Sequence, residues 1–285
     1  MVFNFKSQFT KTYKYMNIVL NIFRQMIKEN KYLFIQKRGQ KRIQDLEGIF
    51  TAILYKVKSG CQWRLLPVEL FVNCSQITVY NYFVSWVNNG FFKDLWINTI
   101  KVYRKIHKIR FYRQSIDSTK IKCIKGGDNT GPNPTDRRRK GSSVHTLIDQ
   151  RGIPLSAIIT GANSSDSSQV ENLINNMVIK NNVHKKRSSI LLADAGYDTN
   201  DVRAFLRRNN YNAIIPYNKR NDKNNKRTKK LTKHQKKQYK FRINIENSYA
   251  HLKNHRTLAL RYEVKSEHFM ALIHIGFVFN IASKI

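Results

Sequence analysis

The 285-residue chain carries 52 Lys and Arg residues against 18 Asp and Glu residues, a formal net charge of +34 at pH 7. This excess of positive charge predicts a polyanionic partner, and because the apolar runs are too short to span a bilayer, we expect DNA and no membrane. The three cysteines form no Cys-x-x-Cys pair, which argues against a zinc site or a disulfide framework and indicates a reducing compartment.

The first part of the chain is predicted to be helical. Residues 1–38 form a basic arm that we expect to be disordered or to contain a short helix. From Ile43 to about Lys58, apolar residues recur at helical spacing, and Gly60 should end that helix. Ser75 is a suitable N-cap for a second helix.

A third helix is expected in residues 91–105. Residues 39–106 are therefore predicted to form a small all-α domain of the helix-turn-helix kind. Two interpretations of this domain have equal weight: it binds specific DNA sequences, or it braces or dimerises the rest of the protein.

Beyond Arg110 the apolar pattern changes and predicts strands interspersed with helices in a second domain, residues 111–285. The expected strands are 113–121, 144–150, 154–162, 188–194 and 212–217. Arg151-Gly152 should be the hairpin turn between the second and third of them.

A basic loop connects the first two predicted strands. Residues 126–142 are rich in Gly and Pro and contain the run Arg137, Arg138, Arg139 and Lys140. Such a loop cannot bury itself, so we interpret the run as a contact with the DNA backbone.

Several other acids have structural explanations. Asp166 is expected to be the N-cap of one helix. Asp198 and Asp201 are expected in the first turn of a later helix, DVRAFLRRN, where acids are favourable. Residues 218–242 are strongly basic and are interpreted as a linker that becomes ordered on DNA, with a solvated charge run as the alternative. The apolar segment 269–281 should form a last helix that packs on the sheet.

Three acids are candidates for a catalytic site. Asp117 lies in the first predicted strand, and Asp194 ends the fourth, where an isolated carboxylate would be costly. Glu246 lies on the helix predicted for Tyr239–Lys253.

At 100° per residue, Tyr239, Arg242 and Lys253 share one stripe of that helix with Glu246, which suits a metal-binding carboxylate flanked by phosphate-binding cations. An amphipathic helix with one solvated Glu is the simpler alternative.

These motifs resemble those of DDE transposases from bacterial insertion sequences of the fifth family. The segments are IDSTKIK, TGPNPTDRRRKGS, GIPLSAIITGANSSDS, LLADAGYD and the Tyr239-Arg242-Glu246-Lys253 series, in that order. SGCQWRLLP and TVYNYFVSW are similar to the N-terminal part of the same family, although Ile77 stands where an aromatic residue is expected.

The resemblance implies an RNase H-like mixed sheet in which Asp117, Asp194 and Glu246 hold two Mg²⁺ or Mn²⁺ ions. It implies cleavage of the inverted repeats that end an insertion sequence, and their joining to target DNA, by a homodimer bound to double-stranded DNA at the bacterial nucleoid, in the cytoplasm. Arg242 and Lys253 would bind phosphates, and Tyr239 would orient the helix or flanking DNA.

Two other functions remain open. A metal-dependent nuclease of the same fold would cut DNA without joining strands. A decayed or domesticated DNA-binding protein would bind DNA without cutting it, although the presence of all three acids and both phosphate-binding residues speaks against decay.

Overall fold

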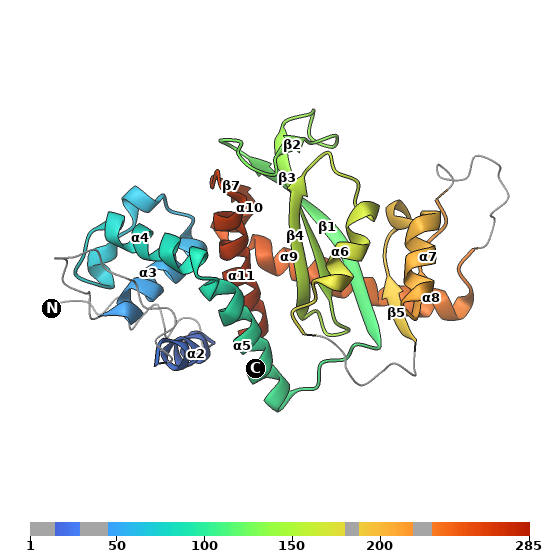
Figure 1. Cartoon of the computed structure of the whole chain (residues 1–285), viewed down its shortest axis with the longest axis horizontal. Helices are drawn as coiled ribbons and strands as arrows, with labels where there is room; N and C mark the ends of the chain where they lie inside the picture. Colours follow the sequence, from blue (N-terminus) through green and yellow to red (C-terminus); the bar gives the residue numbers. More distant parts are fainter. Residues whose placement is uncertain (1–14, 29–44, 180–187, 219–229) are drawn as a thin grey trace. The chain divides into compact units, whose positions relative to one another are not determined.

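A computed structural model describes residues 15–28, 45–179, 188–218 and 230–285 (Figure 1). The chain folds into two compact units, residues 1–107 with 252–285 and residues 108–251. Most of the predicted basic arm and residues 219–229 of the predicted linker lie outside the described residues.

The first unit is helical. Its elements are α2 (Met16–Lys28), α3 (Leu46–Ser59), η1 (Trp63–Leu65), η2 (Val68–Leu70), α4 (Gln76–Asn88), α5 (Phe91–Ile106), α10 (Arg256–Ala259), β7 (Leu260–Arg261) and α11 (Ser266–Ala282), where η marks a short 3-10 helix. Aromatic side chains fill much of its interior: Phe23 of α2 stacks on Phe50 of α3 with ring centroids 4.3 Å apart. Trp86 of α4 packs edge-on against both rings.

Two predicted helix ends of this unit are confirmed, at Gly60 and Ser75, whereas the predicted start at Ile43 lies outside the described residues and α3 begins at Leu46. Gly60 ends α3 with a φ of 74°, a left-handed conformation that favours glycine. The Ser75 side chain accepts a hydrogen bond from the Thr78 amide at the start of α4. Within the predicted arm, a short helix forms as α2.

Helix α11 differs from its prediction. It was expected on the sheet, but it packs mainly on α5 and also touches α2, α3 and α4. Nearly every residue of α11 is buried, so it serves as the central helix of this unit. The domain boundary expected at 111–285 therefore differs from the two compact units in the placement of residues 252–285.

The second unit is built on a mixed sheet. Its strands are β1 (Arg113–Cys123), β2 (Gly131–Pro132), β3 (Lys140–Ile148), β4 (Pro154–Gly161), β5 (Ser189–Leu192) and β6 (Tyr211–Ile214). Apart from the two-residue β2, these strands lie in the order β4-β3-β1-β5-β6. β3 is antiparallel to β4 and β1, and β5 is parallel to β1 and β6. This arrangement confirms the predicted mixed sheet and all five predicted strands.

Helices complete the second unit. They are η3 (Ser167–Gln169), α6 (Val170–Asn175), η4 (Ala195–Tyr197), α7 (Asn200–Arg208), α8 (Lys233–Tyr239), η6 (Lys240–Arg242) and α9 (Ile243–Lys253), the last of which ends within the first unit. Ile116 and Leu147 of the sheet form a core with Leu173 of α6 and Leu206 of α7. The core fixes the positions of β1, which carries Asp117, and of β5, after which Asp194 follows.

Three local predictions are corrected. The N-cap of α7 is Thr199, so Asp198 precedes that helix; it is buried and pairs with Arg203 at 2.6 Å. The described end of the predicted linker is helical: Thr232 and Gln235 form a capping box that starts α8. Tyr239 and Arg242 therefore belong to α8 and η6, ahead of the helix that carries Glu246.

No helix in the described ranges is long and apolar enough to span a membrane.

A buried ion pair links distant parts of the first unit. Lys56 of α3 donates to Glu263 at 3.0 Å, and their side chains are only 5% and 9% exposed. Replacing Glu263 with Ala should lower the free energy of unfolding of this unit by about 3–5 kcal/mol, because the Lys56 ammonium would remain buried without its partner. Urea unfolding followed by Trp fluorescence measures the change, since all three tryptophans of the chain lie in this unit.

Glu267→Ala provides the matched control. Glu267 and its partner Lys265 are 57% and 62% exposed, so the loss of their contact should cost less than about 1 kcal/mol. Equal destabilisation by the two substitutions would contradict a structural role for the Lys56–Glu263 pair.

Candidate active site

Asp117 lies near the middle of β1, where two donors bind its carboxylate. Oδ2 accepts a hydrogen bond from Nη2 of Arg242 at 2.8 Å, and Oδ1 accepts one from the Ser118 amide at 2.9 Å. Burial raises the pKa of Asp117, while the Arg242 guanidinium and the Ser118 amide oppose that rise. The carboxylate is thus largely removed from water and depends on a neighbouring positive charge.

The parallel pairing of β1 and β5 brings Asp194 near Asp117. Ser115 of β1 is the register partner of Leu192 of β5, and each Asp lies two residues beyond its member of that pair. The charge of Asp194 contributes to the raised pKa of Asp117. Asp194 itself is half-buried, and its Oδ1 accepts a hydrogen bond from the Gly196 amide at 2.8 Å, which caps η4. Two of the three predicted acids therefore lie near one another, one on β1 and one just beyond the end of β5.

Arg242 is held from a second side by Tyr239. Nη1 of Arg242 donates to the Tyr239 hydroxyl at 2.9 Å, and the guanidinium lies over the tyrosine ring, 5.5 Å from its centroid. Tyr239 thus helps to orient the Arg242 guanidinium toward Asp117, whereas its predicted role in orienting the helix or flanking DNA stays a prediction.

The helix α9 is fixed to the sheet by Tyr249. Its hydroxyl donates to the backbone oxygens of Asp117 at 2.6 Å and Val144 at 3.2 Å. Burial, followed by the charge of Asp117, raises the pKa of Tyr249 well above its ordinary value, so the hydroxyl keeps its proton. This contact sets the distance between α9 and the strand that carries the acid.

Glu246 is exposed on α9, whereas Tyr249 is buried, so the predicted stripe does not form one continuous exposed face. Among the described residues, no group of three or more His, Cys, Asp or Glu side chains is close enough to hold a metal ion. The role of Glu246 as the third ligand therefore stays a prediction. Lys253 is exposed at the end of α9, and its phosphate contact also stays a prediction.

The basic loop before β3 has an ordered turn. The Asn133 carbonyl accepts hydrogen bonds from the amides of Asp136 and Arg138, and the Asn133 amide donates to the Arg139 carbonyl. Arg137 and Arg138 adopt left-handed φ values of 47° and 59°, which cost about 1–3 kcal/mol each where the surroundings impose them.

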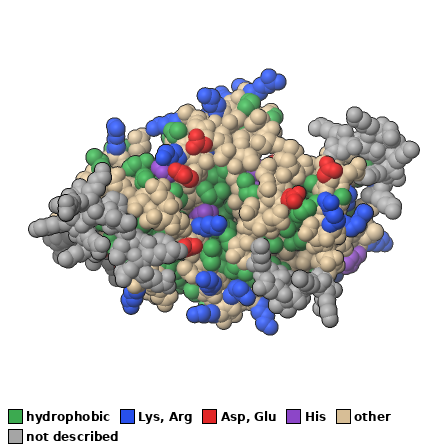
Figure 2. Space-filling view, in the orientation of Figure 1, with side chains coloured by type: hydrophobic (Ala, Val, Ile, Leu, Met, Phe, Trp, Pro, Cys, Tyr) green, Lys and Arg blue, Asp and Glu red, His purple; other side chains and the backbone are tan. Residues whose placement is uncertain are grey.

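The side chains of the basic run, Arg137–Lys140, are exposed. Figure 2 shows Lys and Arg side chains at the upper edge of the face drawn, where β2 and its loop lie in Figure 1. The turn therefore presents a row of cations to solvent, as expected for a contact with phosphates.

Arg113 is a residue that the sequence analysis missed. It is buried in β1, lies over the Phe241 ring with 3.7 Å from its guanidinium carbon to the centroid, and donates from Nε to Gln238 at 2.8 Å. These contacts fix α8 and η6 to the sheet and so place Arg242 at Asp117. The signal in the sequence is an Arg at the start of a predicted strand, four residues before Asp117.

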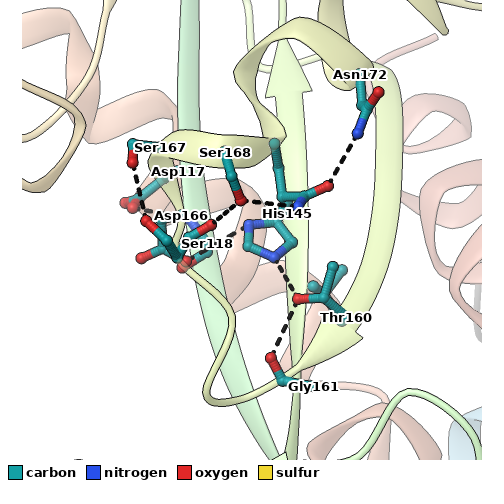
Figure 3. Close-up of polar contacts among 12 residues, drawn as sticks. Asp117, Ser118, His145, Thr160, Gly161, Asp166, Ser167, Ser168 and Asn172 are labelled. Atoms are coloured by element: carbon teal, nitrogen blue, oxygen red, sulfur yellow. Dashed lines mark hydrogen bonds and ion pairs between the residues drawn. The ribbon is translucent and has the colours of Figure 1, made fainter. Parts of the chain in front are cut away.

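The predicted N-cap role of Asp166 is wrong. Asp166 precedes η3, but its side chain makes no capping hydrogen bond. Its Oδ1 lies instead 3.5 Å from Nδ1 of His145, a fully buried residue of β3 (Figure 3). His145 was not predicted as a site residue, because nothing in the sequence near it indicates that β3 contacts the connection between β4 and α6.

Two family models match the chain. A model described as a transposase DDE domain matches residues 112–280, more than half of the sequence. A model for candidate transposases of the IS4/5 family matches residues 22–96.

Curated relatives agree with these matches. Over 154 residues the chain is 33% identical to a candidate transposase of insertion sequence element IS402 from Burkholderia cepacia. The match covers 53% of this chain and 67% of the relative. Over 84 residues it is 30% identical to an uncharacterized 16.2 kDa protein of insertion element IS402 from the same organism. This second match covers 30% of this chain and 56% of that protein. The chain thus spans about two thirds of the first relative and little more than half of the second.

Solved structures give only distant matches. The Mos1 strand transfer complex is 15% identical, with 66% of this chain and 63% of that chain covered and a TM-score of 0.25. The Mos1 mariner paired end complex with Mn is 16% identical, with coverages of 68% and 65% and a TM-score of 0.27. TM-scores this low support no statement about the site of the present chain.

The attachment of α9 to β1 can be tested at Tyr249. Tyr249→Phe should lower the free energy of unfolding by about 1–3 kcal/mol, because two backbone oxygens would lose their buried donor. Urea unfolding followed by circular dichroism measures the loss. Tyr112→Phe is the control, since Tyr112 lies in the same unit and is 52% exposed. If both variants unfold at the same urea concentration as the unmodified protein, the hydroxyl does not hold α9.

Proposed function

We propose that this chain, which belongs to the DDE transposase family, cuts the inverted-repeat ends of an insertion sequence and joins them to target DNA by metal-dependent phosphoryl transfer. The observation that carries the proposal is the meeting of Asp117 and Asp194 at neighbouring parallel strands, with Arg242 bound to the first of them. Such a meeting of like charges, one of them largely buried, is costly unless cations balance it.

The residues at this site suit a hard divalent cation. Asp117 and Asp194 offer carboxylate oxygens, and neither Cys nor His lies among the predicted ligands, which favours Mg²⁺ or Mn²⁺ over zinc. Two bound ions would activate the attacking hydroxyl and stabilise the leaving oxygen. Glu246 is proposed as the ligand that α9 contributes.

The cationic side chains have separate roles in this proposal. Arg242 binds Asp117 in the structure and would therefore lie within reach of a phosphate held at the metal ions of the site. Tyr239 orients the Arg242 guanidinium. Lys253 and the Arg137–Lys140 run would bind DNA phosphates further along the backbone.

The partner follows from charge and family. A chain with a net charge of +34 and the DDE family match is proposed to bind double-stranded DNA, both as transposon ends and as target. We further propose that it acts as a homodimer on DNA, at the nucleoid in the bacterial cytoplasm.

The catalytic assignment can be tested at Asp117. Asp117→Asn should lower the rate of Mg²⁺-dependent cleavage of DNA that carries the inverted repeats by at least about a thousandfold, because several kcal/mol of transition-state stabilisation depend on the ligand. DNA binding, measured by a mobility shift, should persist. Asp128→Asn, in an exposed part of the basic loop, should cut normally.

The same assay separates the alternatives. Cleavage by the unmodified protein without strand joining would indicate a nuclease, and binding without cleavage in Mg²⁺ or Mn²⁺ would indicate a decayed element. Undiminished cleavage by the Asp117 variant would remove Asp117 from the mechanism.

The basic loop can be tested through salt dependence. Replacing Arg137, Arg138, Arg139 and Lys140 with Gln should reduce the slope of log K against log salt concentration by about 3–4, because each phosphate contact on duplex DNA contributes about 0.9. Fluorescence anisotropy at several NaCl concentrations measures the slope. Arg207→Gln with Arg208→Gln, at the exposed end of α7, should change it little. An equal change per removed charge in both variants would show that only bulk charge matters.

A further inference from the structure

Asp166 is an acid without a structural explanation. Its side chain is 34% exposed, yet Oδ1 is buried and has no hydrogen-bond partner among the described residues. It caps no helix, although it lies directly before η3 and α6. A carboxylate oxygen withdrawn from water in this way is costly unless a donor or a cation is near it.

His145 faces that oxygen from the interior. The ring is fully buried on β3, with Nδ1 3.5 Å from Oδ1 of Asp166 and Nε2 2.8 Å from the Thr160 hydroxyl (Figure 3). Burial lowers the pKa of His145, while Asp166 raises it and Lys120 lowers it, so the neutral ring is favoured. An apolar residue would fill this position at lower cost, which points to a role for the ring.

The hydrogen-bond partners select one form of the ring. Only a proton on Nδ1 presents a donor to the Asp166 carboxylate, and Nε2 must then accept from the Thr160 hydroxyl. That contact, at 2.8 Å, is shorter than the 3.2 Å contact from the same hydroxyl to the Gly161 carbonyl. Thr160 thus holds the ring from its Nε2 side, and Nδ1 faces Oδ1 of Asp166 at 3.5 Å, a separation too long for a formed hydrogen bond.

The electrostatic surroundings of Tyr197 include Asp166 and both acids of the proposed active site. It is 1% exposed, and its hydroxyl has no hydrogen-bond partner among the described residues. Burial raises its pKa well above the ordinary value, and the charges of Asp166, Asp117 and Asp194 add to the rise. A buried, unpaired hydroxyl therefore lies within the electrostatic reach of all three carboxylates.

The sheet register agrees with this placement. His145 of β3 is the register partner of Ser118 of β1, the residue next to Asp117. The buried Tyr249 also experiences the charges of both Asp117 and Asp166. Asp166 therefore belongs to the surroundings of Asp117, although the three acids are not close enough together to bind one ion directly.

We propose that Asp166, positioned by His145, is a further acidic residue of the divalent-cation site of Asp117 and Asp194, and that it binds water molecules on the cation. Mg²⁺ and its substitutes keep several waters in protein sites, and carboxylates outside the direct ligands accept hydrogen bonds from them. This inference rests on the proposed metal-dependent function.

The test measures Mn²⁺ binding to the full chain without DNA, by the electron paramagnetic resonance signal of free Mn²⁺. Asp166→Asn should weaken Mn²⁺ affinity by about 10-fold or more, the usual effect of losing a residue that supports a metal site. Glu171→Gln, an exposed acid of α6 that loses the same charge, should change the affinity by less than about twofold. Asp117→Asn serves as the reference for the site itself.

The outcomes separate this inference from the proposed function. If Asp117→Asn abolishes binding and Asp166→Asn leaves it unchanged, Asp166 is not part of the site, while the proposed function stands. If Asp117→Asn binds Mn²⁺ like the unmodified protein, the metal site of the proposed function is itself wrong. If Glu171→Gln weakens Mn²⁺ affinity as much as Asp166→Asn does, the loss comes from the change in overall charge, and Asp166 is not a residue of the site.

A double variant tests the role of His145. If His145 acts through Asp166, then His145→Gln combined with Asp166→Asn should weaken Mn²⁺ binding no more than Asp166→Asn alone. Additive losses would overturn the positioning role. Because Asp166 is partly exposed, its single variant decides the main inference even where His145→Gln does not fold.

Discussion

The ion pair between Asp117 and Arg242 is the interaction on which the arrangement of the site depends. β1 and β5 run parallel, so two carboxylates come close together, and their mutual repulsion has to be balanced inside a protein. Arg242 supplies that balance from a segment 125 residues further along the chain. The position of η6, and therefore the start of α9, is tied to the charge of one strand residue.

The other contacts around the site keep this ion pair in place. Arg113 and Gln238 attach α8 to the first residue of β1, and Tyr249 attaches α9 to the backbone of Asp117 itself. Both attachments use donors that are buried or nearly so, where an unmade hydrogen bond is expensive. The helix that carries Glu246 is thus held to β1 through Tyr249 in its middle and through Arg242 just before its start, while Glu246 remains on its exposed side.

Sequence reasoning reached the features that local patterns encode. Runs of apolar residues indicated the strands, Ser75 and Gly60 marked helix ends, and Asp117 and Asp194 stood out because acids are costly in buried strands. What it missed depends on contacts between distant segments. His145 becomes meaningful only when β3 meets the connection that carries Asp166, and Arg113 only when α8 lies against β1.

Helix α11 has a consequence for synthesis of the protein. The core of the helical unit is shared between residues near the N-terminus and α11, with the whole sheet unit encoded between them. During synthesis, the face of α5 that α11 covers stays uncovered until α11 emerges, after residues 108–251 have been made. The helical unit is therefore completed only after the sheet unit has been synthesised, and termination before residue 266 would leave it without its central helix.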